Sequence, residues 1–340
     1  MDSFLALSRQ DQKLLIEQTA ARKGWMAGSV EKDFWVCWTL RQLFALPALA
    51  GHLTFKGGTS LSKAWGLIDR FSEDIDLTIG RDALGFGGEN SPEQAATSKQ
   101  QAKRLKALRG ACGEFVRHTL LTSLNQQFAV ELGVAGWTLA PDADDADGQT
   151  LLFQYPAHFG GGHGRYVRAI VKIEFGARSD PWPAHERMVQ PVMAEAYPQA
   201  FLAPCTQVLA LAPERTFWEK AMLLHEEGCR PEGKIRRARL ARHYYDLYRL
   251  INGGIAARAV ADADLFYQVL AHRRVFFAHT WVDYDAIRTG ALRMVPPAAQ
   301  EASWRHDYLS MQDEMFSAPP PSFDELLAVV RHFESTFRPA

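Results

Sequence analysis

The sequence lacks most of the features that stabilise secreted proteins or anchor proteins in membranes. It has only four cysteines in 340 residues, and no two of them form a CxxC pair. This spacing argues against a disulfide framework and against a structural zinc site. No apolar run approaches the ~20 residues that span a bilayer, and the N-terminal segment is charged from Asp2 onward, unlike a signal peptide. We therefore expect a cytoplasmic protein with no membrane partner.

The sequence also lacks an excess of either charge. It has 38 Lys and Arg residues against 39 Asp and Glu residues, which gives a formal net charge of −1. This balance provides no overall attraction to nucleic acid, so a nucleic-acid partner has to be bound by a local basic patch. Hydrophobic residues make up 47% of the chain, which is ordinary for a globular protein. The length suggests two domains.

Hydrophobic periodicity divides the chain into a mixed first part and a helical second part. The first part is predicted to contain helices over 10–22, 30–46, 60–68 and 101–124, and strands over 52–56, 74–79, 126–134, 149–157 and 166–177. From about residue 205 the pattern becomes helical, with helices expected over 213–227 and 234–253. A proline-containing stretch precedes this change, so we place the boundary between domains 1–200 and 201–340.

The stretch from Lys56 to Asp76 combines a glycine pair with two closely spaced carboxylates. Its glycines, Ser and Lys first suggest a P-loop, but the required spacing of Gly, four residues and Gly-Lys-Ser/Thr is absent. What remains is Gly57–Ser60 at the start of a short helix, followed by Asp74 and Asp76 on a strand. Side chains at i and i+2 of a strand share a face, so the two carboxylates converge. A divalent cation relieves the repulsion between such charges.

The glycine pair and a third acid complement these carboxylates. Gly57 and Gly58 let backbone N–H groups approach an anion at a helix N-terminus, which favours negative charge. Glu174 lies in an apolar strand, where an unpaired carboxylate would be costly. Three acids on neighbouring strands can hold two Mg²⁺ (or Mn²⁺) ions, one activating a hydroxyl and one stabilising a leaving pyrophosphate. The combination therefore suits a metal-bound nucleoside triphosphate (NTP).

The order of these motifs resembles the DNA polymerase β-type nucleotidyltransferase superfamily and, within it, the AbiEii/AbiGii family of toxins. These toxins belong to abortive-infection toxin–antitoxin pairs. The resemblance covers about residues 25–255 and is carried by EKDFWV (31–36), KGGTSLSK (56–63), RFSEDIDL (70–77), PERTFWEKAMLLH (213–225) and RHYYDLYRL (242–250). It implies an α/β (α+β) fold, in which a polymerase-β-type nucleotidyltransferase domain with a mixed sheet precedes a C-terminal helical domain.

The resemblance also implies roles for individual residues. Nucleotide binding is assigned to Gly58 and Ser60, with further candidates in Lys56, Gly57, Thr59 and Arg70. The metal-binding core is assigned to Ser72, Asp74 and Asp76, and Glu174 fits the third carboxylate of the superfamily, whose role varies within the toxin branch. Lys220 matches a lysine that contacts nucleotide phosphates, and Asp246 matches an acid near the same site.

From the residues alone, the last two assignments have simpler alternatives. Lys220 fits a surface lysine whose stem packs on apolar neighbours, and Asp246 fits the ion-pair partner of Arg242 or Arg249.

The activity that the resemblance implies is a Mg²⁺-dependent transfer of NMP from an NTP to the 3′ end of tRNA, which blocks translation. A cognate antitoxin encoded nearby is the implied regulator. Two basic runs, at 99–109 and 234–243, are candidates for contact with RNA phosphates, and the best of their residues are Arg236, Arg237 and Arg239. Two other functions stay open: a nucleotidyltransferase that modifies a protein or small molecule, and a non-catalytic module that binds GTP or ATP.

Overall fold

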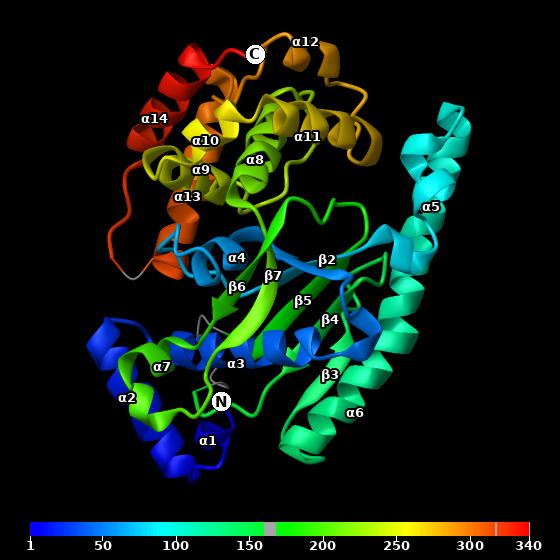
Figure 1. Ribbon diagram of the computed structural model, residues 1–340. Coiled ribbons are helices and arrows are strands. Elements are labelled where there is room, and N and C mark those ends of the chain that lie inside the picture. Colours follow the sequence, from blue (N-terminus) through cyan, green and yellow to red (C-terminus); the bar gives the residue numbers. More distant parts are fainter. Residues whose placement is uncertain (160–167, 317, 340) are drawn as a thin grey trace. The chain divides into compact units, whose positions relative to one another are not determined.

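The computed structural model describes residues 1–159, 168–316 and 318–339 (Figure 1). The chain divides into two compact units, which we describe separately. The first unit comprises Met1–Trp65 and Phe71–Ala210, and the second comprises Gly66–Arg70 and Leu211–Ala340. The short segment Gly66–Arg70 thus groups with the second unit, although residues of the first unit flank it in the chain.

A seven-stranded mixed sheet forms the centre of the first unit, in the order β3-β4-β5-β2-β1-β7-β6. Strands β1 and β2 are antiparallel, whereas β2 runs parallel to β5 and β1 runs parallel to β7. The strands are β1 (Leu53–Lys56), β2 (Ile75–Ile79), β3 (Thr138–Pro141), β4 (Thr150–Gln154), β5 (Ile170–Gly176), β6 (Ala184–Val189) and β7 (Thr206–Leu211).

Helix α3 (Ala27–Phe44) is the most deeply buried helix of this unit. It packs against β5, and all of its residues from 29 to 43 except Arg41 are buried. The short α4 (Gly57–Lys63) follows β1 directly and contacts both β1 and β2. The other helices are α1 (Asp2–Leu5), α2 (Arg9–Lys23), α5 (Ser98–Glu114), α6 (Leu121–Leu132) and α7 (Val192–Ala196), with a π-helical segment (Phe115–Leu120) that joins α5 to α6 (Figure 1).

An aromatic cluster fixes α3 against the sheet. Trp35 and Trp38 of α3 meet Phe153 of β4 with ring centroids 5.8 and 5.6 Å apart, and Phe128 of α6 lies 4.7 Å from Trp38. All four side chains are almost completely buried. Burial of large aromatic rings contributes strongly to stability, so this cluster holds the polar residues at the start of α3 in one position.

The second unit is built from helices (Figure 1). Trp218 forms part of its core, where its ring lies 4.8 Å from that of Phe266 and 5.2 Å from that of Phe337. No helix in the described ranges has both the length and the apolar character needed to cross a membrane. The helices are α8 (Pro213–Gly228), α9 (Arg242–Asn252), α10 (Ile255–Ala261), α11 (Ala263–Phe276), α12 (Tyr284–Arg288), α13 (Ala298–Met315) and α14 (Phe323–Thr336).

The predicted fold class is confirmed: a mixed sheet with helices precedes a helical second part. Strands lie within the predicted ranges 52–56, 74–79, 149–157 and 166–177, although residues 166–167 lie outside the described residues. The division after Ala210 differs from the predicted boundary after residue 200. The reason is β7, which pairs with β1 and therefore belongs to the first unit.

The strand predicted over 126–134 is wrong, because residues 126–132 belong to α6, which ends at Leu132. Its alternating apolar residues suggested a strand, yet Val130 and Val134 are 85% and 93% exposed. Leu124 and Phe128, spaced four residues apart on one helix face, are the buried ones. Burial in this segment therefore follows the four-residue spacing of a helix and not the two-residue alternation of a strand.

The helix predicted over 234–253 begins only at Arg242. Upstream, Arg239 has a φ of 67°, in the left-handed region that interrupts a helix. The backbone N–H groups of Arg239 and Ala241 donate hydrogen bonds to the Asp307 carboxylate instead of to helical carbonyls. Three strands, β3, β6 and β7, were not predicted, since their short segments lie in stretches rich in proline, aspartate or turn residues.

Candidate active site

A row of charged side chains crosses the middle of the sheet in the first unit. Lys56 of β1 is the register partner of Asp76 of β2, which in turn is the register partner of Glu174 of β5. Register partners place their side chains on the same face, and the Asp76 carboxyl contacts that of Glu174. The sheet thus brings three of the predicted site residues together.

Lys172 belongs to the same patch, although the sequence analysis did not identify it. It precedes Glu174 by two residues on β5, and its Nζ lies 2.5 Å from Glu174 Oε1. Burial alone would lower the pKa of Lys172, but the carboxylates of Glu174 and Asp74 raise it. Burial alone would raise the pKa of Glu174, but Lys172 lowers it below its ordinary value. The alternation of Lys172 and Glu174 on one strand face was the available signal.

Gly57 is required where it stands. Its φ is +78°, and a Cβ at this position would lie only 2.0 Å from Asp76 Oδ2. Both the backbone conformation and the close approach of a carboxylate therefore disfavour any residue with a Cβ, which would have to displace the Asp76 side chain. Because α4 begins at Gly57, the start of this helix is brought directly against the carboxylate row.

Two hydroxyl groups of α4, those of Thr59 and Ser60, are buried. The buried Thr59 hydroxyl donates to the Asp74 carbonyl oxygen at 2.5 Å and lies 2.9 Å from Ser72 Oγ. Ser60 is 2% exposed, and its hydroxyl has no hydrogen-bond partner among the residues that the structure describes. A buried hydroxyl without a partner costs free energy, so Ser60 is a natural contact for a ligand. Gly58, between Gly57 and Thr59, adds a second residue without a side chain.

The donor chemistry of this patch fits a divalent cation. Carboxylate oxygens are the ligands that Mg²⁺ prefers. Asp76 is the register partner of Glu174, and Asp74 lies two residues before Asp76, just ahead of β2. Across the described ranges, no group of three or more His, Cys, Asp or Glu side chains is gathered closely enough to hold a metal ion. The oxygen donors of a cation site are thus present in the sequence positions expected, but among the described residues they are not drawn together around one point, and Glu174 is paired with Lys172.

A second cluster of predicted residues lies wholly within the second unit. Asp246 is fully buried and receives two hydrogen bonds from Arg70, from Nε at 2.7 Å and from a terminal nitrogen at 2.9 Å. The Nζ of Lys220 lies 2.9 Å from the same carboxylate and 3.1 Å from Nδ1 of His243. Lys220 is thus buried and is not the surface lysine that its sequence context suggested. The ion-pair partners of Asp246 are Arg70 and Lys220, whereas the sequence suggested Arg242 or Arg249.

The pKa shifts in this cluster follow from burial and charge. Burial alone would raise the pKa of Asp246, but Arg70 and Lys220 hold it well below its usual range. Burial and the charge of Lys220 lower the pKa of His243 well below its ordinary value. His243 is therefore neutral, and its Nδ1 can accept a hydrogen bond from the Lys220 ammonium group. Sequence reasoning missed His243 because nothing in its spacing marked it.

The three arginines predicted to bind RNA lie on the segment between α8 and α9. The Arg236 guanidinium stacks on Trp304 at 3.7 Å from the ring centroid and donates to Ser303 Oγ. Arg239 is anchored through its backbone N–H, which donates to Asp307. Arg237 and Arg239 are exposed, whereas Arg236 is half-buried. The structure therefore leaves Arg237 and Arg239 better placed than Arg236 to meet a large partner.

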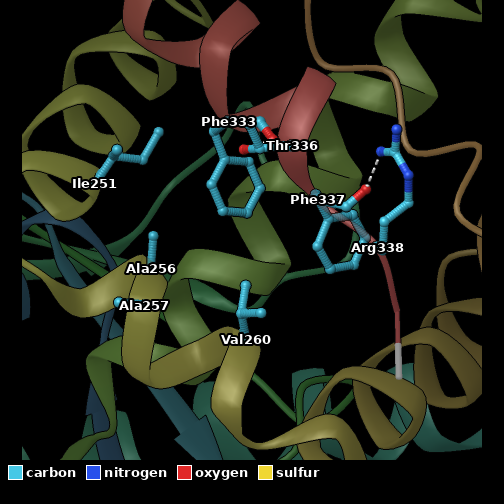
Figure 2. Close-up of a pocket in the computed structure, with 8 residues that line it drawn as sticks. All are labelled: Ile251, Ala256, Ala257, Val260, Phe333, Thr336, Phe337 and Arg338. Carbon is cyan, nitrogen blue, oxygen red and sulfur yellow. Dashed lines mark hydrogen bonds between the residues drawn. The ribbon is translucent and has the colours of Figure 1, made fainter.

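A pocket of about 480 Å³ lies between α9, α10 and α14 of the second unit (Figure 2). Apolar side chains dominate its lining, and Arg338 is its charged member. None of the predicted site residues lines the pocket, so it takes no part in the predicted chemistry. The lining residues are Ile251, Ala256, Ala257, Val260, Phe333, Thr336, Phe337 and Arg338.

Comparison with known proteins identifies the class of enzyme. A model of nucleotidyltransferase toxins matches residues 38–329, which is most of the chain. The chain is therefore a nucleotidyltransferase and a toxin. It belongs to the AbiEii family of type IV toxin–antitoxin systems, and the resemblance stated from the motifs is confirmed.

Two further comparisons add little to the family match. No curated protein matches the chain. Among solved structures, the nucleotidyltransferase toxin MenT4 of Mycobacterium tuberculosis H37Rv is similar over 98% of this chain and 100% of its own, with 19% sequence identity and a TM-score of 0.46.

The close approach of Asp76 to Gly57 predicts two separate effects of a methyl group at position 57. It strains the backbone, and it also displaces the Asp76 carboxylate from its place in the candidate site. Gly57→Ala and Gly85→Ala both place alanine at a φ near +80°, which costs roughly 1–2 kcal/mol. Only residue 57 has a neighbour within 4 Å of the new Cβ. We expect the backbone strain to lower the unfolding free energy by a similar amount in both variants. Nucleotidyl transfer should be lost only in Gly57→Ala. Equal activity in the two variants would contradict this account.

The low pKa of Asp246 predicts a pH-dependent contribution to stability. The folded-state pKa lies below the unfolded value of ~3.9, so the stabilisation is present above that pH and is lost as the pH falls below it. Asp246→Asn leaves Arg70 and Lys220 without their counter-charge, and we expect about 3–5 kcal/mol lower unfolding free energy at pH 7. In urea titrations this deficit should shrink below about pH 4. The exposed Asp264→Asn is the control, and a deficit that does not change with pH would contradict the prediction.

Proposed function

We propose that this toxin transfers NMP from an NTP to the 3′ end of tRNA and so blocks translation. The reaction would use Mg²⁺ (or Mn²⁺) bound by Asp74 and Asp76, with Glu174 as the third acid of the site. A cognate antitoxin encoded nearby would neutralise it, as expected for a type IV toxin–antitoxin family.

The observation that carries the proposal is the meeting of carboxylates with the start of α4. Asp76 contacts Glu174 on one side and lies against Gly57 on the other. The Ser60 hydroxyl, buried and without a partner among the described residues, is on the same helix. Acidic oxygens beside a glycine turn and an unused hydroxyl are the groups that a metal-bound triphosphate requires.

Each residue has a defined task in this proposal. Ser60 donates a hydrogen bond to a phosphate oxygen, and Gly57 and Gly58 allow the triphosphate to approach the backbone. Thr59 and Ser72 hold the start of β2 in place, since the Thr59 hydroxyl donates to the Asp74 carbonyl. Asp74 and Asp76 would hold the metal ion, which would supply a lower pKa for the attacking 3′-hydroxyl and charge neutralisation for the leaving pyrophosphate. Lys56, the neighbour of Asp76 in the row, supplies further positive charge.

For Lys220 and Arg70 we propose contact with nucleotide phosphates. Asp246 would then act as a positioning residue, because it binds both cations and holds them in fixed orientations. Its full burial by these two partners argues against direct metal binding by this carboxylate.

The proposed tRNA acceptor rests on the resemblance and on the exposed basic side chains near α9. Arg237 and Arg239 are exposed on one short segment, where their charges can meet RNA phosphates. A protein or small-molecule acceptor would have no need of them.

The proposed reaction predicts metal-dependent labelling of tRNA. We expect α-labelled NTP to label total tRNA in the presence of Mg²⁺, and the label to disappear in an Asp74→Ala/Asp76→Ala variant or with a chelator. The matched control is Asp144→Ala/Asp147→Ala, which removes two acids of an exposed loop. Label in protein or in a small molecule would replace the tRNA proposal with the first alternative. Nucleotide binding with no labelled product would favour the non-catalytic alternative.

The proposed RNA contact predicts that charge reversal in this segment weakens the use of tRNA as a substrate and leaves the affinity for the NTP unchanged. Arg237→Glu/Arg239→Glu should raise the KM for tRNA at least tenfold and leave the Kd for the NTP within about twofold, because phosphate contacts dominate nucleic-acid affinity. Arg331→Glu, also at an exposed arginine, is the control. Equal KM values for tRNA, or salt-independent tRNA turnover in the unmodified enzyme, would rule the contact out.

A further inference from the structure

Three consecutive charged residues at the start of α3 are buried, which is unusual for charged side chains. Glu31, Lys32 and Asp33 are 2%, 4% and 6% exposed. Consecutive residues on a helix point in different directions, so each side chain reaches a different part of the first unit. Glu31 accepts the backbone N–H groups of His158 and Phe159. The other two reach the elements that carry the candidate site.

Asp33 binds the end of α4. One carboxylate oxygen accepts a hydrogen bond from Lys63 Nζ at 2.7 Å, and the other accepts one from the backbone N–H of Val192 at 2.7 Å. Lys63 is the last residue of α4, which carries Gly57, Thr59 and Ser60. Burial alone would lower the pKa of Lys63, but the Asp33 carboxylate raises it, so the ammonium group stays charged.

Lys32 binds the residue beside the first site carboxylate. Its Nζ lies 2.5 Å from Glu73 Oε2, and Glu73 directly precedes Asp74. Lys32 is buried, whereas the Glu73 side chain is 35% exposed. Two adjacent residues of α3 are therefore tied by ion pairs to the two elements that meet in the candidate site, α4 and the start of β2.

We propose that Lys32 and Asp33 are positioning residues that hold α4, which carries Ser60, and the segment from Asp74 to Asp76 in their relative positions for catalysis. This inference rests on the proposed function of that site. The aromatic cluster of α3 fixes the helix, and the two ion pairs transmit its position to both halves of the site. A displacement of about 1 Å between such groups can lower a rate about a hundredfold, so the pairs act on turnover as well as on stability.

The test replaces each ion pair by a neutral pair that retains the fold. Replacement of a whole buried ion pair by neutral side chains is often neutral or stabilising, whereas removal of one partner is destabilising. We therefore compare Asp33→Asn/Lys63→Met and Lys32→Met/Glu73→Gln with the unmodified enzyme. Asparagine at position 33 can still accept the Val192 N–H. Lys63→Arg retains the charge pair and serves as the conservative variant.

The matched control is another ion pair of the first unit. Arg81 follows β2 at the end opposite Asp74 and binds Asp180. Arg81→Met/Asp180→Asn removes this pair and should leave turnover within about twofold of the unmodified enzyme.

Two readouts are measured for every variant that melts within a few degrees of the unmodified protein. The first is kcat for transfer of labelled NMP to tRNA, expected to fall at least tenfold in either neutral-pair variant and less than threefold in Lys63→Arg. The second is the Kd for Mn²⁺ alone by electron paramagnetic resonance, expected to weaken at least threefold in either neutral-pair variant. Well-folded neutral pairs with unchanged kcat and Mn²⁺ affinity would overturn the proposal, as would equal losses in the Arg81/Asp180 control.

The two readouts also separate this proposal from the proposed function. If the unmodified enzyme labels no tRNA, the acceptor proposal fails, while the Mn²⁺ comparison still tests the positioning role. If one neutral pair prevents folding, the other carries the test, because Glu73 is partly exposed and its replacement disturbs less packing.

Discussion

The approach of the Asp76 carboxylate to the backbone of Gly57 is the constraint on which the candidate site depends. A carboxylate can occupy the space of a missing Cβ only if β1, α4 and β2 follow one another with fixed geometry, and the register of Lys56 with Asp76 provides it. The parallel pairing of β2 with β5 then brings Glu174 against Asp76. Like charges held this closely repel. Lys172 and Lys56 offset part of this charge in the protein, and a bound divalent cation would offset it more fully.

Buried ion pairs are the second organising feature, and both units use them. In the second unit Asp246 holds Arg70 and Lys220, while in the first unit Lys32 and Asp33 hold Glu73 and Lys63. Buried pairs contribute little net stability compared with apolar packing, but the loss of one partner is costly. Their common property is that they fix direction and distance. An enzyme that must align a triphosphate, a metal ion and a hydroxyl gains from such fixed geometry.

Part of the candidate site's geometry was predictable from the sequence, for a definite physical reason. The glycine pair and the Asp74/Asp76 spacing reflect local geometry, and local geometry is encoded in neighbouring residues. His243 and the partners of Asp246 were missed or misassigned because they depend on contacts between residues far apart in the chain, such as Arg70 with Asp246. Lys172 was missed although its partner Glu174 lies only two residues away on the same strand. The fold class was predictable from periodicity, whereas the segment 126–134 was not, since its apolar alternation combines the buried Phe128 with the exposed Val130 and Val134. The left-handed Arg239 that delays α9 likewise follows from contacts with Asp307.

The most direct test of the central claim is anomalous diffraction from crystals of the enzyme with Mn²⁺ and a non-hydrolysable NTP. Our account predicts a manganese peak about 2.1–2.2 Å from carboxylate oxygens of both Asp74 and Asp76, with a phosphate oxygen within hydrogen-bond distance of the Ser60 hydroxyl. Manganese and triphosphate bound at any other part of the protein, with the Asp76 carboxylate still against Gly57 and Glu174, would contradict it.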